Sequence, residues 1–132
     1  MFSMKDIANL KEVIHNQGSW DNHTSILIEH SDSKIIKDES AIIHYAKMLS
    51  DVISIQKPGK CYIAQRIEAK EYSMFQLVEN SCIAGDISFD KPKSSVEIFT
   101  SKNLNLEEVL RITKEFFDTP FLEVTTFLKV AN

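Results

Sequence analysis

Histidine, cysteine, serine and carboxylate side chains are the groups in this chain that could bind a metal or act on a substrate. None of the four histidines lies four residues from another, the spacing that places two imidazoles on one face of a helix. Cys61 and Cys82 are too far apart in sequence for a C-x-x-C pair. The sequence therefore predicts neither a metal site nor a disulfide framework. Serines and carboxylates remain, and several of them lie in residues 72–117.

Composition and charge exclude several classes of function. The 132 residues are 43% apolar, and 15 Lys and Arg stand against 19 Asp and Glu, giving a formal charge of -4. No basic cluster would attract a phosphate backbone, so we expect no nucleic-acid partner. No apolar run reaches the ~18 residues of a membrane span. The N-terminal segment carries charged residues at Lys5, Asp6, Lys11 and Glu12. These charges exclude the apolar core of a signal peptide. We expect a cytoplasmic protein.

Apolar periodicity predicts the elements of the first half. Residues 2–15 form an amphipathic helix, because three apolar residues recur at helical spacing: Ile7, Leu10 and Ile14. Residues 23–29 are expected to form a strand. A second helix follows, capped by Asp38. Its apolar stripe consists of Ile42, Ala46, Leu49 and Ile53. The sequence Lys57-Pro58-Gly59 ends this unit.

The second half is richer in strands. Alternating or β-branched segments predict strands at 61–68, 73–79, 82–89 and 95–100. A helix over 105–117, capped by Asn105, and a closing strand at 121–129 complete the order. This order predicts an α+β fold, a two-layer α/β sandwich in which a mostly antiparallel sheet carries the helices on one face. Residues 1–20 are expected to be an N-terminal helical addition to a domain formed by residues 21–132.

One stretch of the sequence resembles a known family. Residues 72–117 include YSMFQLVENSCIAGDIS and then SSVEIFTSKNLNLEEVLRITKEFF. They resemble the short prokaryotic pyruvoyl-dependent S-adenosylmethionine decarboxylases. In that family an acidic strand end precedes a serine that becomes the pyruvoyl group. A histidine follows five residues later, and then a strand ending in Phe-(Ser/Thr)-Cys. Here Ser81 matches the serine, and VEIFTS matches the last strand without a gap.

The resemblance implies a self-processing enzyme of spermidine biosynthesis. The Ser81 hydroxyl would attack the carbonyl of Asn80, and a base-driven elimination would cleave the chain and leave a pyruvoyl cofactor at residue 81. That group would form a Schiff base with S-adenosylmethionine, or a related amino acid, and accept electrons while CO₂ leaves. Ser73 matches the family serine that assists processing. Asp90 matches the family glutamate that binds the substrate ribose.

Three positions depart from the family pattern. Asp86 stands where the family has the processing histidine, and a carboxylate with a pKa near ~4 is a weaker base than an imidazole near ~6.5. Ser101 replaces the cysteine that protonates the substrate, and an alcohol is a far weaker acid than a thiol. Ile67 replaces the aromatic residue that stacks on adenine. Cys82 follows Ser81, but strand alternation sends its side chain to the opposite face.

Three functions remain open at this point. The chain is a pyruvoyl decarboxylase that uses Asp86 and Ser101 in altered roles, an unprocessed homologue that binds a small molecule or regulates an active partner, or an unrelated ligand-binding module. Because the base at residue 86 is weak, we expect the bond between Asn80 and Ser81 to stay largely intact. The family usually works as dimers, and Phe99 lies on the sheet face away from the helices. We therefore expect a homodimer that buries this face.

Overall fold

The computed structural model describes residues 22–31, 38–79, 81–101 and 103–128. Its elements follow the order β1 (Asn22–Glu29), α2 (Glu39–Ile53), β2 (Cys61–Arg66), β3 (Glu71–Val78), β4 (Ser81–Ser88), β5 (Lys93–Thr100), α3 (Leu106–Phe117) and β6 (Leu122–Leu128). Each strand and helix that the sequence predicts within these ranges is confirmed, with small shifts at the ends. The helix expected at residues 2–15 lies outside the described residues.

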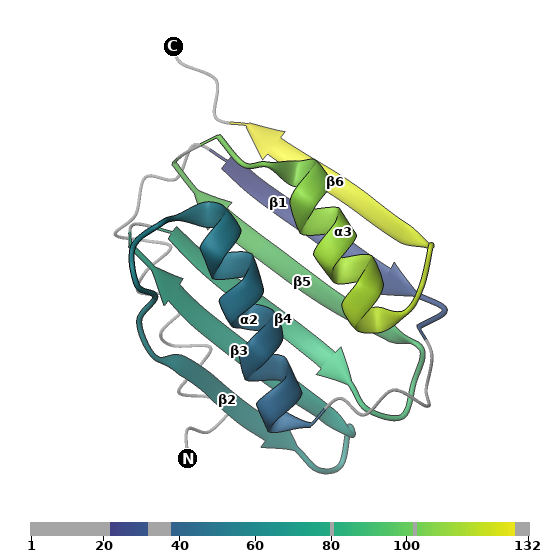
Figure 1. The fold of residues 1–132 in the computed structure, drawn as a ribbon. Helices are drawn as coiled ribbons and strands as arrows, with labels where there is room; N and C mark the ends of the chain where they lie inside the picture. Colours follow the sequence, from purple (N-terminus) through teal and green to yellow (C-terminus); the bar gives the residue numbers. More distant parts are fainter. Residues whose placement is uncertain (1–21, 32–37, 80, 102, 129–132) are drawn as a thin grey trace.

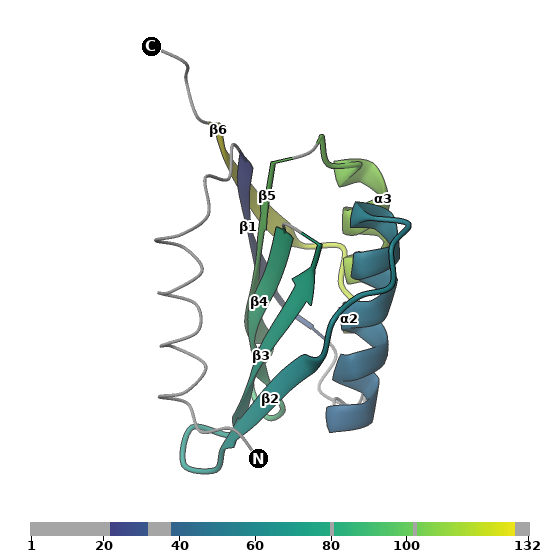
Figure 2. The ribbon, with the colours of Figure 1, turned by 90° about the vertical axis from the view of Figure 1, so that its left-hand side faces the viewer.

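The six strands form one antiparallel sheet in the order β2-β3-β4-β5-β1-β6 (Figure 1). Helices α2 and α3 both lie on the same face of it (Figure 2). The predicted α+β sandwich with helices on one face is therefore confirmed. We call the opposite side, which neither described helix covers, the outer face.

The main core lies between the helices and the sheet. The predicted caps are present, because the Asp38 side chain accepts from the backbone N–H of Ala41 and the Asn105 side chain accepts from that of Glu108. The stripe expected on α2 is buried, and it packs with strand residues that include Ile26, Ile28, Ile83, Ile87, Val96 and Ile98. Tyr45 of α2 contacts α3, because its hydroxyl lies 2.8 Å from Thr113 Oγ1. These contacts fix both helices over the sheet.

Strand alternation divides the remaining apolar side chains between the two faces. A second buried cluster on the outer face contains Ala64, Phe75, Cys82 and Ala84, with Tyr62, Leu77 and Phe99 packed against it. On β5, Val96 and Ile98 belong to the helix-side core, whereas Phe99 belongs to this outer cluster. The predicted separation of these residues is confirmed, and it determines on which face each candidate site residue lies.

Candidate functional site

Ser81 is the first residue of β4. Val78 and Ser81 are cross-strand partners, and Glu79 follows β3 directly. Asn80, the residue expected to precede the cleaved bond, lies outside the described residues. Glu79 has a left-handed φ of 54°, a conformation that costs energy for a residue with a side chain. Its carboxylate accepts a hydrogen bond from Ser54 Oγ at 2.8 Å, which anchors this residue to the end of α2.

The Ser81 side chain faces the helix-side core and has a neutral partner. It is 4% exposed, and its Oγ donates to Thr100 Oγ1 over 2.8 Å. Cys82 lies in the outer cluster, so the expectation that it points away from Ser81 is confirmed. Among the described residues, no carboxylate or imidazole is hydrogen-bonded to Ser81. The Thr100 hydroxyl is a poor base for removing the Ser81 Hα, so this pair of described residues does not by itself fit the formation of a pyruvoyl group.

Ser73 and Asp86 form a pair on the outer face. They are cross-strand partners on β3 and β4, and Ser73 Oγ donates to Asp86 Oδ1 over 2.7 Å. Ser73 is buried and Asp86 is half-buried. Five residues along β4 separate Asp86 from Ser81, which is about 16 Å at ~3.3 Å per residue. Since the two side chains also lie on opposite faces, one chain does not bring the Asp86 carboxylate to Ser81.

The other predicted site residues lie at the two ends of the sheet. Ser101 follows β5 and is exposed, at the same end as Ser81. Asp90 lies beyond the other end of β4, where Lys70 Nζ is 3.8 Å from Asp90 Oδ2. Ile67 lies near it, in the turn after β2, and is 77% exposed. The candidates thus form two groups, with Ser81 and Ser101 at one end and the remaining residues toward the other.

A hollow of about 320 Å³ lies beside the Ser81 end on the helix side. Its lining residues are Asn22, Thr24, Asn103, Leu104, Leu106 and Thr126. Asn22 is the cross-strand partner of Thr100, the residue that holds the Ser81 hydroxyl. Neutral amides and hydroxyls above leucine side chains suit a small polar ligand. The sequence carries no signal of this hollow, because its lining residues come from three distant segments.

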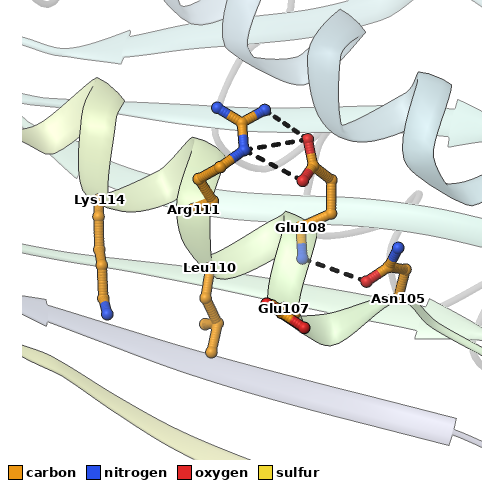
Figure 3. A pocket seen from close by; sticks show the side chains of 6 residues that line it. All are labelled: Asn105, Glu107, Glu108, Leu110, Arg111 and Lys114. Carbon is orange, nitrogen blue, oxygen red and sulfur yellow. Dashed lines mark hydrogen bonds and ion pairs between the residues drawn. The ribbon is translucent and has the colours of Figure 1, made fainter.

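A second hollow, of about 560 Å³, runs along α3 (Figure 3). Leu110 and Lys114 extend from one side of the helix, whereas Arg111 turns toward Glu108 (Figure 3). Arg111 binds Glu108, and its Nη1 donates to Glu115 over 2.9 Å. The Arg111 hydrogen bond lowers the pKa of Glu108. Two carboxylates already hold the Arg111 guanidinium. This hollow is therefore a weaker candidate for a ligand site than the hollow of about 320 Å³, even for an anionic ligand.

His23 makes a contact that its spacing in the sequence does not predict. His23 Nε2 lies 3.1 Å from Glu97 Oε1, and its ring stacks on Phe99 with centroids 4.2 Å apart. Phe127 stacks on the ring from β6 at 5.2 Å. These residues meet because β1 lies between β5 and β6. Local sequence spacing carries no signal of that order.

The described residues give two further negative findings. They contain no group of three or more His, Cys, Asp and Glu side chains arranged to hold a metal ion. In the same part of the chain, no helix has the length and apolar character needed to cross a membrane.

Comparison with known proteins gives a fold. No family model and no curated protein matches the sequence. Three chains of solved structures match the structure, including the crystal structure of the adenosylmethionine decarboxylase from Aquifex aeolicus VF5. That match has a TM-score of 0.69 and covers 87% of this chain and 94% of that chain, at 8% sequence identity. At such low identity the likeness shows the fold alone. The protein therefore has an adenosylmethionine decarboxylase-like fold.

Proposed function

We propose that this protein is an unprocessed homologue of the adenosylmethionine decarboxylases. It keeps the chain intact at Asn80–Ser81, forms no pyruvoyl cofactor, and binds S-adenosylmethionine or a related amino-acid derivative without decarboxylating it. Its role is then to bind this ligand, or to regulate an active decarboxylase, in spermidine biosynthesis. The cytoplasmic location expected from the sequence remains a prediction.

The placement of Ser81 and Asp86 on opposite faces carries this proposal. Cleavage needs a base at the Ser81 Hα once the hydroxyl has attacked the preceding carbonyl. The Asp86 carboxylate is instead bound to Ser73 on the outer face. Decarboxylation then needs an acid to protonate the substrate carbon, and Ser101 carries an alcohol. Both proton-transfer steps are therefore weakened.

Ligand binding has separate support. The fold neighbour is by its name a protein that acts on adenosylmethionine. In this chain the hollow of about 320 Å³ lies beside the Ser81–Thr100 pair and has neutral hydrogen-bonding groups. A compact polar molecule would fit such a lining without requiring the cleavage reaction.

A processed, active decarboxylase is the second candidate. It is favoured by the position of Ser81 after a left-handed residue, Glu79, since backbone strain often collects at reactive sites. Ser81 and Asp86 are far apart within one chain. In a two-fold homodimer, however, one end of a chain can lie against the other end of its partner. In that arrangement the carboxylate of one protomer would serve the serine of the other.

Thermal unfolding with and without ligand tests the proposed function. S-adenosylmethionine at 100 times its Kd stabilises by about 2.7 kcal/mol. With an unfolding entropy of about 2.1 cal/mol/K per residue, this corresponds to a Tm increase of about 10 °C. Asn103→Ala should reduce the shift if the ligand occupies the hollow, and Asp90→Ala should reduce it if the ligand binds at the opposite end. No shift at millimolar ligand contradicts the binding proposal.

Release of CO₂ from S-adenosylmethionine separates the two candidates. The unprocessed homologue should release none above a Ser81→Ala control, even under conditions where the ligand raises the Tm. Turnover that Ser81→Ala abolishes would support the active enzyme.

A further inference from the structure

Thr24 places a hydroxyl group in the lining of the hollow of about 320 Å³. This residue is 2% exposed and lies on the helix side of β1, between its cross-strand partners Ile98 and Thr126. Its hydroxyl has no hydrogen-bond partner among the described residues. Every fully buried side-chain oxygen in the same part of the chain has one. The oxygen of Thr24 therefore belongs to the small exposed part of the residue, which faces the hollow.

An unpaired hydroxyl at this depth indicates a ligand. A buried hydroxyl without a partner lowers stability, whereas valine has nearly the same shape as threonine and no polar group. The neighbour on β5, Ile98, is apolar and belongs to the helix-side core. A molecule in the hollow can supply the missing hydrogen bond. The hydroxyl and the hollow are thus two separate observations that favour a ligand at the same place.

The lining of the hollow carries no charged side chain. Its polar groups are two hydroxyls and two amides, and its apolar groups are two leucines. The carboxylates in the first turn of α3, Glu107 and Glu108, line the other hollow instead. A charged group that left water for this lining would meet no opposite charge, and that is costly. The group that enters the hollow is therefore uncharged.

Two hydroxyls lie side by side in this lining. Thr24 and Thr126 are cross-strand partners, so their Cβ atoms are about 4.5–5.5 Å apart. Each hydroxyl can donate one hydrogen bond and accept others, which suits two adjacent hydroxyl groups of a ligand. Leu104 and Leu106 line the hollow where α3 begins, over this half of the sheet (Figure 1). They offer an apolar surface to the C–H groups of a ring.

We propose that the hollow binds a sugar ring with adjacent hydroxyl groups, held by Thr24 and Thr126. The inference rests on the proposed function and adds that the uncharged ribose of S-adenosylmethionine enters the hollow, rather than its charged methionine part. A volume of about 320 Å³ is at the small end of ligand sites, so the hollow takes one part of such a molecule. A free monosaccharide has the same chemistry, and the experiment separates the two sources.

NMR titration of isotope-labelled protein tests the sugar site directly. Millimolar adenosine should shift the backbone amide signals of Thr24, Leu106 and Thr126, whereas adenine and L-methionine should leave them unchanged. D-ribose with the same Kd as adenosine would assign the site to a sugar alone, and tighter binding of adenosine would assign it to a nucleoside. Adenine or L-methionine binding there as tightly as adenosine would overturn the proposal.

Removal of single hydroxyls, from the ligand or from the protein, gives the second test. 2′-Deoxyadenosine lacks one of the two adjacent hydroxyls and should bind at least ~5-fold more weakly than adenosine. Thr24→Val should raise the Kd of adenosine by a similar factor, and Thr24→Ser, which keeps the hydroxyl, should largely restore it. Thr125→Val is the matched control, because Thr125 is exposed next to Thr126 on the other face of β6. It should leave the Kd unchanged.

An unchanged Kd in a folded Thr24→Val overturns the proposal. If that variant does not fold, the comparison of adenosine with 2′-deoxyadenosine decides on the unaltered protein, and equal Kd values overturn it. Thermal unfolding with S-adenosylmethionine separates this inference from the proposed function. A Tm increase without any adenosine shift in the hollow refutes the sugar site alone. Adenosine bound in the hollow, without a Tm increase from S-adenosylmethionine, supports the sugar site and contradicts the proposed function.

Discussion

The hydrogen bond from Ser81 to Thr100 allows a structural role of Ser81 to be measured. Both side chains are buried, and their oxygens are 2.8 Å apart. A neutral hydrogen bond contributes about 0.5–1.5 kcal/mol net, and a buried group left without its partner costs about 1–3 kcal/mol. We therefore expect Ser81→Ala and Thr100→Val each to lower the free energy of unfolding by about 1–2 kcal/mol. For a chain of this length, each kcal/mol corresponds to a Tm change of about 4 °C.

The double variant gives the stronger test. Once one partner is absent, removing the other no longer breaks the bond, so the combined loss should be about 1 kcal/mol smaller than the sum of the single losses. Urea unfolding of the four proteins measures this coupling, provided that the slope with denaturant stays constant. Ser40→Ala, at an exposed serine of α2, serves as the control and should change stability by less than about 0.5 kcal/mol. Additive losses, or a neutral Ser81→Ala, would refute the structural role.

Three further predictions concern the core and its titration. Tyr45→Phe should lower the free energy of unfolding in urea by about 1 kcal/mol, because it removes a buried hydrogen bond to Thr113. Burial, and secondly a neighbouring carboxylate, raise the pKa of Cys61 from 9.0 to about 11. Its protonated thiol thus stabilises the fold below pH 9, and this contribution should fall as pH rises toward 11. When the free energy of unfolding is measured between pH 9 and pH 11, the loss caused by Cys61→Ser should be smaller at the higher pH. Gly85→Ala should lower the Tm, because an added Cβ would lie 3.2 Å from the Ser95 carbonyl oxygen.

Much of the fold follows from local pattern. The apolar stripe of α2, the Asn105 cap of α3 and the alternation of Val96 and Phe99 on β5 all depend on nearby residues. The apolar periodicity and the capping residues therefore predict these features. The strand order β2-β3-β4-β5-β1-β6 depends on pairing between distant segments, which local pattern does not predict.

The sequence proposes candidate site residues, but it does not predict how they are arranged in space. Ser73 and Asp86 are thirteen positions apart and meet because β3 and β4 pair in one particular register. A shift of one residue would move either side chain to the other face. The hollow near Thr100 and the contact of His23 with Glu97 depend on the place of β1 between β5 and β6, which no local signal specifies.

Denaturing mass spectrometry of the purified protein tests the central claim most directly. We expect one species with the 15.1 kDa mass of the uncleaved chain, and Ser81→Ala should change this mass only by that of the substitution. Two fragments, one ending at Asn80 and the other beginning with a pyruvoyl group at residue 81, would contradict the account. They would establish that the chain forms its own cofactor despite the distance between Ser81 and Asp86.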